Sequence, residues 1–199
     1  MIDIAARLFA RRGFSATGVA DLCEAVGLGK GSLYYYIKSK NHLLGMIHDR
    51  VVQEVLQSAR DVLELDAHPT ERLRVLGLEL VNIIARYPDH VWVFLHEWRA
   101  LTGEEAVEFK RKRSIYEEAV ESILVDGVEQ GIFEIADTRL AVLAWLGMHN
   151  YSYQWYRREG RLRPFQIASG FHDLFVQGIL ANSDRGPRPR DRLAPTEGD

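Results

Sequence analysis

Apolar residues recur at three- and four-residue spacing along almost the whole chain, and strand signals are nearly absent. This spacing places apolar side chains on one face of an α-helix, whereas a half-buried strand needs strict alternation. The longest example follows Ser39, where Leu43, Leu44, Ile47 and Val51 begin a continuous stripe. Hydrophobic residues make up 47% of the 199 residues, which is enough to fill a core. The sequence therefore predicts an all-α protein.

Glycine and proline divide the periodic stretches into about nine helices. We expect helices over about 2–12, from just after Thr17 to 26, over 30–36, and from Ser39 onward, followed by 70–86, 88–101, 105–130, 138–157 and 164–181. Pro69, Pro88 and Pro164 stand near the starts of three of the later segments, where a missing N–H costs little. Residues 183–199 are rich in Pro, Arg and Asp without apolar periodicity, so we expect a disordered tail.

Charge is distributed unevenly along the chain. Residues 1–40 carry a net charge of +3, and the rest carries −6. A basic end on an acidic body suits a protein that meets phosphate with one end only. The single cysteine, Cys23, excludes an internal disulfide, and no secretory signal or membrane-spanning run is visible. We therefore expect a cytoplasmic protein without a membrane partner.

Two short helical segments, separated by residues 26–29, carry the most informative pattern. A turn of three or four residues that includes glycine is typical of a helix-turn-helix, and Gly27 can supply the positive φ of such a turn. The segment after the turn contains three consecutive tyrosines, which cannot all point inward on a helix. At least one phenol must face outward, where it can contact phosphate or base edges.

This segment resembles the DNA-binding domain of TetR-family regulators. The match is carried, in order, by Ala5-Ala6-Arg7-Leu8-Phe9, Gly13-Phe14, Thr17, Val19, Ala25-Val26-Gly27-Leu28, Gly31-Ser32-Leu33-Tyr34-Tyr35-Tyr36 and Ser39-Lys40-x-x-Leu43. Two positions depart from the family pattern. Gly29 replaces the usual Ser or Thr cap of the recognition helix, and Ile37 replaces a Phe.

The resemblance implies a DNA-contacting role for particular residues. Thr17 would bond a phosphate through its hydroxyl or backbone N–H, and Lys40 would hold the DNA backbone electrostatically. The recognition surface would consist of Lys30, Ser32, Tyr34, Tyr35 and Tyr36. Phe9, Leu22 and Leu33 would form the core of the small domain.

The resemblance also implies a division of the chain. Residues 1–44 would form a three-helix DNA-binding domain, and 45–182 a larger helical bundle for ligand binding and dimerisation. Two aromatic-rich segments of that bundle combine apolar walls with polar groups, as small-molecule sites do. The candidate ligand contacts are Trp92, His96, Arg99, Trp145, His149 and Tyr153. Each aromatic residue has an alternative interpretation as ordinary core packing.

The last two helical segments are the candidate dimer surface. The apolar stripe on 164–181 is broader than a monomer needs to bury, so pairing with a twofold copy would form a four-helix bundle. Its candidate residues are Tyr156, Phe165, Phe171, Leu174, Phe175 and Ile179. Two copies would also present two recognition helices to successive half-sites of DNA.

Taken together, the pattern predicts a ligand-responsive transcriptional regulator, most simply a repressor that leaves its operator when an effector binds. A looser resemblance, over Trp155-Tyr156-Arg157-Arg158-x-Gly160, points to regulators that respond to acyl-CoA thioesters, with Arg99, Arg157 or Arg158 near a CoA phosphate. A helical enzyme and a helical adaptor without DNA binding are the alternatives. No H-E-x-x-H, G-x-S-x-G or phosphate-binding glycine loop is present, so we expect neither a metal nor another cofactor.

Overall fold

The computed structural model describes residues 1–181 and confirms an all-α fold. Its elements, in chain order, are α1 (Ile2–Arg12), α2 (Val19–Val26), α3 (Lys30–Tyr36), α4 (Lys40–Leu63), α5 (Pro69–Arg86), α6 (Pro88–His96), the 3-10 turn η1 (Trp98–Ala100), α7 (Gly103–Glu129), α8 (Thr138–Asn150), α9 (Ser152–Trp155) and α10 (Pro164–Ile179). The only β-pairing among these residues is an isolated bridge between Phe133 and Leu180. The tail predicted to be disordered, 183–199, lies outside the described residues.

The helix ends follow from local chemistry. The Ser39 hydroxyl accepts a hydrogen bond from the backbone N–H of His42 at 2.9 Å and so caps α4 as predicted. Prolines occupy the first turn of α5, α6 and α10. Two predicted helices are divided in the structure. Segment 88–101 breaks at Glu97 between α6 and η1, and segment 138–157 breaks at Tyr151 between α8 and α9.

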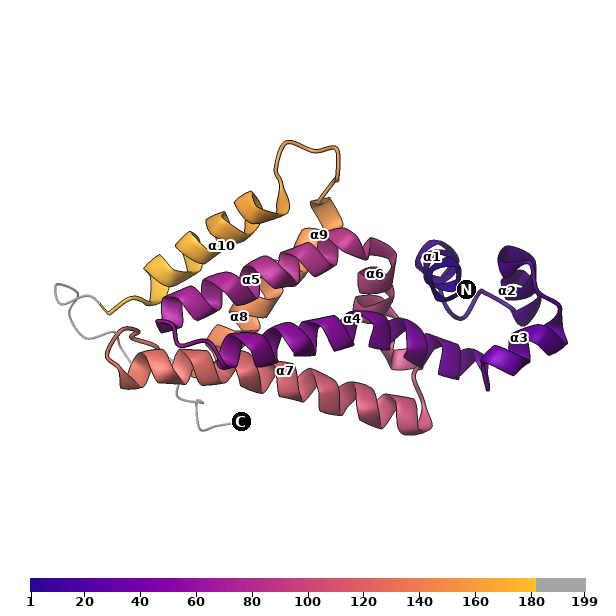
Figure 1. Ribbon diagram of the computed structural model, residues 1–199, viewed down its shortest axis with the longest axis horizontal. Helices are drawn as coiled ribbons and strands as arrows, with labels where there is room; N and C mark the ends of the chain where they lie inside the picture. The colour runs from indigo at the N-terminus through magenta and orange to yellow at the C-terminus, as the bar shows by residue number, and fades with distance from the viewer. Residues whose placement is uncertain (182–199) are drawn as a thin grey trace, which may run out of the picture.

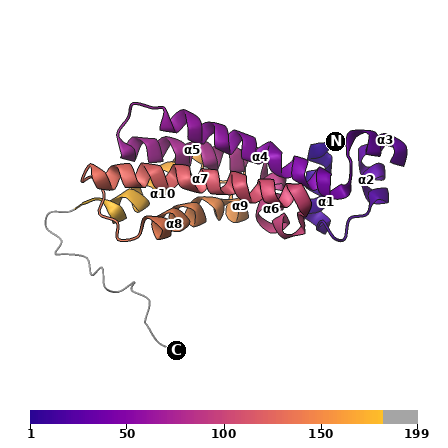
Figure 2. The same cartoon turned by 90° about the horizontal axis from the view of Figure 1, so that it is seen from below.

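The helices α1–α3 form one end of an elongated molecule (Figure 1). The long helix α4 leaves α3 and runs into the bundle, with α7 alongside it in both views (Figure 2). Helix α10 packs mainly on α5, and α8 contacts α5, α7 and α10. Helix α6 lies against α1 and α4, between the small N-terminal domain and the bundle.

Two hydrophobic cores lie along this axis. The bundle core is built by α4, α5, α7 and α8, with Leu76 and Trp145 among its fully buried side chains. The N-terminal core holds Phe9, Leu22 and Leu33, as the sequence predicted, but it also takes in side chains from α6 and α7. The expected domain boundary after residue 44 falls inside α4, so one rigid helix belongs to both parts.

No helix within residues 1–181 is long and apolar enough to cross a membrane.

Candidate DNA-binding and effector sites

Helices α2 and α3 form a helix-turn-helix whose turn depends on one glycine. Gly27 has φ of 69° and ψ of 31°, the left-handed conformation that glycine adopts without steric cost. Its N–H bonds back to carbonyls of α2, which ends that helix. Gly29 precedes α3 in extended conformation and offers no side-chain cap. Leu33 is the buried residue of α3 and anchors the helix to the N-terminal core.

The remaining surface of α3 faces solvent. Lys30, Ser32, Tyr34, Tyr35 and Tyr36 are all exposed. Tyr35 is the most exposed of the tyrosines, at 84%, and its ring packs edge-to-face against Tyr36 at 5.2 Å between centroids. The structure therefore brings together, on one projecting helix, a cation, a hydroxyl and three phenols that can bond phosphates and bases.

Thr17 lies differently from the prediction. It is fully buried, its hydroxyl donates to the carbonyl of Gly13 at 2.8 Å, and its N–H donates to the carbonyl of Phe14 at 3.2 Å. Both donors are thus used inside the α1–α2 turn, because the turn itself leaves backbone carbonyls that need partners. Helix α2 begins one residue later, after Gly18, whose N–H donates to the Asp21 carboxylate at 2.7 Å.

Lys40 lies against the Phe14 ring and near two carboxylates. Its ammonium lies 4.1 Å from the centre of the Phe14 ring, a cation–π geometry. Partial burial lowers its pKa, while the nearby carboxylates of Glu97 and Asp21 act in the opposite direction. Lys40 therefore stands at the base of the small domain, at the first turn of α4.

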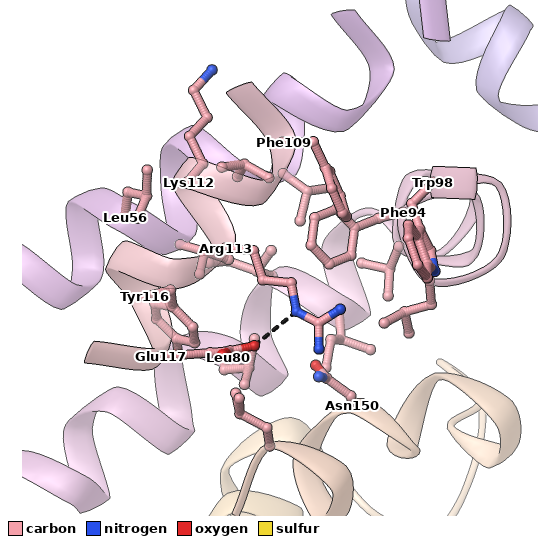
Figure 3. Close-up of a pocket in the computed structure, with 18 of the residues that line it drawn as sticks. Leu56, Leu80, Phe94, Trp98, Phe109, Lys112, Arg113, Tyr116, Glu117 and Asn150 are labelled. Carbon is pink, nitrogen blue, oxygen red and sulfur yellow. Dashed lines mark hydrogen bonds and ion pairs between the residues drawn. The ribbon is translucent and has the colours of Figure 1, made fainter. Parts of the chain in front are cut away.

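A cavity of about 280 Å³ lies inside the bundle (Figure 3). Helices α4, α5, α6 and α8 supply a mostly aliphatic wall, with the rings of Phe94, Trp98 and Phe109 at one side. The full lining consists of Val51, Val52, Val55, Leu56, Leu80, Ile83, Ile84, Val91, Phe94, Leu95, Trp98, Phe109, Lys112, Arg113, Tyr116, Glu117, Leu143, Leu146, Gly147 and Asn150. An apolar chamber with a few polar groups is what small-molecule sites require.

The polar groups of the cavity come from α7 and the end of α8. The Arg113 Nε donates to Glu117 Oε1 at 2.7 Å, drawn as the dashed line in Figure 3. Arg139 donates to the other carboxylate oxygen of Glu117. The Glu117 side chain is 7% exposed, so these two cations neutralise a nearly buried charge. The guanidinium of Arg113 and the amide of Asn150 are directed toward the same part of the cavity (Figure 3).

None of the predicted ligand residues lines this cavity; they are Trp92, His96, Arg99, Trp145, His149 and Tyr153. Trp145 and His149 are buried against each other in the bundle, and burial lowers the pKa of His149 to about 4. Trp92 stacks on His96, which bonds the Tyr153 hydroxyl at 3.0 Å. Arg99 lies over the Trp98 ring. Their role in ligand binding stays a prediction, and the structure gives each a packing role.

The sequence analysis missed the charged lining residues because the sequence of α7 is typical of a solvent-exposed helix. It carries Glu, Lys and Arg at spacings typical of surface ion pairs, such as Arg113 and Glu117 at i and i+4. The signal that could have been used is the apolar stripe that runs beside them, through Phe109, Tyr116 and Val120.

The candidate dimer residues have mixed positions. Phe165 and Leu174 on α10 are 62% and 71% exposed. Phe171, Phe175, Ile179 and Tyr156 are half-buried against the protein's own core. On α8, Leu140 and Leu143 are exposed as well. Large apolar side chains therefore remain uncovered on α8 and α10.

Helix α6 and the turn after it connect the cavity to the N-terminal domain. Val91, Phe94 and Leu95 of α6 line the cavity. Immediately beyond, Glu97 Oε1 accepts the backbone N–H of Phe14 at 3.0 Å. Asn41 of α4 donates to the carbonyl of Ala100 at 2.7 Å. Helix α6 and the turn after it thus link the cavity wall to the α1–α2 turn and to the start of α4.

Comparison with known proteins assigns both halves of the chain. Residues 1–47 match the family model "Bacterial regulatory proteins, tetR family", and residues 66–179 match "Tetracyclin repressor-like, C-terminal domain". This chain is a member of the TetR family. The resemblance of residues 4–44 to TetR-family regulators is confirmed.

Several TetR-family proteins are similar over almost the whole chain. The regulator PfmR of Thermus thermophilus is 31% identical, with a TM-score of 0.82, covering 88% of this chain and 96% of its own. AibR, solved in complex with isovaleryl coenzyme A and operator DNA, is 28% identical with a TM-score of 0.78, covering 87% and 94%. The repressor KstR2 of Mycobacterium tuberculosis is 24% identical over 186 residues, 90% of each chain.

Membership of the TetR family decides between the function classes left open by the sequence. The chain is a DNA-binding transcriptional regulator and not an enzyme. In the part of the chain that the structure describes, no group of three or more His, Cys, Asp or Glu side chains is arranged to hold a metal ion.

Proposed function

We propose that this TetR-family protein binds operator DNA as a cytoplasmic homodimer and leaves it when a small effector occupies the bundle cavity. Residues 1–44 then serve DNA binding, and 45–182 serve effector binding and dimerisation. The observation that carries the proposal is the exposed face of α3. A helix held by one buried leucine presents Lys30, Ser32 and three tyrosines to the outside, as a recognition helix must.

The homodimer is supported by the exposed apolar residues of α8 and α10. A protein that leaves Leu174, Phe165 and Leu140 uncovered gains free energy by burying them against a second copy. Dimerisation also doubles the number of base contacts, since a single seven-residue helix reaches only a few bases. We propose phosphate contacts for Lys40 and for the backbone near the first turn of α2, rather than for the Thr17 hydroxyl.

The effector is proposed to be small and largely apolar, since most of the cavity wall is aliphatic or aromatic. The complex of AibR with isovaleryl coenzyme A supports an acyl-CoA-like effector as one form of such a ligand. Release follows if an occupant pushes on α6 and, through Glu97 and Asn41, changes the tilt of α4 and the spacing of the two recognition helices.

Selection of binding sites from random duplex DNA by the full-length protein tests this proposal. We expect a palindromic sequence with two half-sites about one helical turn apart. Affinity for that sequence should fall by about a thousandfold between 50 and 200 mM salt, since Lys30, Lys38 and Lys40 of each protomer would give the dimer about six phosphate contacts. Failure to enrich any sequence, or affinity that does not respond to salt, would contradict the proposal.

A further inference from the structure

We propose that the bundle cavity takes an acyl group, with its chain against the apolar wall and its carboxyl-derived oxygen between Arg113 and Asn150. The inference rests on the proposed function, because it identifies the effector of that same site. It assigns the polar anchor of the ligand to two residues that the sequence analysis did not single out.

The first support is the way Arg113 is held. Its Nε donates to Glu117 Oε1 at 2.7 Å, and Arg139 occupies the second oxygen of Glu117. The nearly buried Glu117 carboxylate therefore holds the Arg113 guanidinium through its Nε–H. Within residues 1–181 the structure gives no hydrogen-bond partner to the Nη atoms of Arg113. Glu117 therefore fixes the orientation of the guanidinium, and the four N–H groups on its two Nη atoms are available to donate to a ligand.

The second support is the residue opposite. Asn150, the last residue of α8, lines the same cavity, and its side-chain amide has no hydrogen-bond partner among the described residues. Figure 3 shows the Arg113 guanidinium and the Asn150 amide, from α7 and α8, directed toward the same part of the cavity. An oxygen placed between them can accept from both. Hydrogen bonds from a charged donor are the stronger kind, so an oxygen with concentrated negative charge is favoured.

The third support is the shape of the rest of the site. Away from Arg113 and Asn150, most of the wall is made of Leu, Ile and Val side chains and the rings of Phe94, Trp98 and Phe109, and Lys112, Tyr116 and Glu117 are the remaining polar residues of the lining. Such a wall favours a hydrocarbon chain. The volume of about 280 Å³ is near the lower end of small-molecule sites, which span roughly 300–1,000 Å³. The cavity is therefore suited to a short or medium acyl chain and cannot enclose a nucleotide.

The position of Arg113 and Asn150 is compatible with two kinds of acyl ligand, a free carboxylic acid and a thioester. Leu143 and Gly147 of α8 line the cavity and are exposed, and the Arg113 side chain is half-exposed. These residues mark the mouth between α7 and α8. A free carboxylate would end at this mouth. A thioester would place its carbonyl there and its larger group outside.

The test uses two pairs of probes that differ in the carboxyl-derived oxygen. Octanoate is compared with 1-octanol, and octanoyl coenzyme A with S-octyl coenzyme A, by titration of the full-length protein. In at least one pair we expect the acyl probe to bind at least tenfold more tightly than its match. Arg113→Gln should remove this preference. Arg111→Gln is the matched control, since Arg111 lies on the same helix, pairs with Glu108, and does not line the cavity.

The outcome also identifies the source. A preference in the octanoate pair indicates a free acid, and one in the coenzyme A pair indicates a thioester. Equal binding within both pairs, no binding of any probe, or a preference that survives Arg113→Gln would overturn the inference. Operator binding by the ligand-free protein is measured on the same samples. If that binding is present while the probe preference is absent, the acyl site fails but the proposed regulator does not.

Discussion

Three consecutive tyrosines stay at the surface because α3 is short and attached through one residue. Successive helical residues turn by about 100°, so Tyr34, Tyr35 and Tyr36 spread over most of the circumference. Only Leu33 of this helix is buried, and no further element within residues 1–181 covers the tyrosines. Their exposure leaves apolar ring surface in water, which stability alone does not favour. A DNA surface is the physical reason we propose for it.

We expect Tyr35→Ala to weaken operator binding by about tenfold, since each protomer loses one contact to base or phosphate. The free energy of unfolding should change by less than about 0.5 kcal/mol, because the side chain is 84% exposed. Fluorescence anisotropy with labelled operator and urea unfolding measure the two effects. Val107→Ala, at an exposed site on α7, is the control. A matching loss of stability would show that Tyr35 supports the fold.

His48, in contrast to these exposed tyrosines, is a polar side chain buried in the protein interior. It is buried between the rings of Phe94 and Phe109, and neither ring nitrogen has a hydrogen-bond partner among the described residues. Burial lowers its pKa to about 3, from 6.5. The unfolded chain therefore binds a proton on His48 at a pH where the folded protein does not.

This difference predicts that stability falls as pH decreases from about 6.5 toward 3. Each such histidine contributes up to roughly 1.4 kcal/mol per pH unit. His48→Phe should reduce the slope of unfolding free energy against pH by about that amount between pH 6 and 5. Urea unfolding at several pH values measures it. An unchanged slope in the variant would mean that His48 is not kept neutral by burial.

At the scale of elements, α6 and η1 determine how the two parts of the molecule meet. The helix stops at His96, and the next residue, Glu97, turns its carboxylate to the Phe14 N–H at the start of the α1–α2 turn. Across the same boundary, Arg7 pairs with Asp89, and Asp3 Oδ1 lies 3.2 Å from Nε2 of His90, whose pKa is lowered by burial. These contacts are local and polar, so they can shift without unfolding either core.

Glu97→Ala should free the Phe14 amide. We expect hydrogen exchange in the peptide that spans the α1–α2 turn to become at least several-fold faster, because this N–H loses its acceptor. Glu97→Gln keeps an acceptor oxygen and is the matched control, for which we expect near-native exchange. Equal exchange in the two variants would show that the hydrogen bond does not restrain the turn.

Helices are also the scale at which sequence reasoning succeeded and failed. The ends of α1 and α2 and the Ser39 cap follow from residues within a few positions, such as Gly13 and Gly27, so they could be predicted. The cavity lining could not. Periodicity identifies the apolar face of a helix but not which neighbour covers it. Trp145, a predicted ligand residue, packs in the core, and Arg113, which the sequence analysis did not single out, lines the cavity.

At the scale of the whole molecule, one surface of the bundle remains apolar. Leu174 of α10 is 71% exposed, although the helix packs its other side on α5. A second copy of the chain is the proposed cover, and it would place the two copies of α3 at a fixed distance. Operator affinity then depends on residues far from the DNA surface.

Leu174→Glu should convert the dimer to a folded monomer, since it adds a charge to the proposed interface without entering the protein's own core. Sedimentation velocity measures the change of mass, and we expect operator affinity to fall at least a hundredfold with it. Val107→Glu makes the same change at a 69% exposed site on α7 and should remain dimeric. A dimeric Leu174→Glu protein would exclude this face as the interface.

The sequence by itself determined the order of the helices, most of their bounds and the exposed surface of α3, because these depend on spacing, caps and turns that act over a few residues. Only the tertiary structure decided which side chains meet across helices. It placed Arg113 of α7 and Asn150 of α8 on one cavity, and it packed Val93 of α6 and Phe109 of α7 into the core of the N-terminal domain. The physical reason is that helix crossing and rotation are set by packing between elements, which no local pattern specifies.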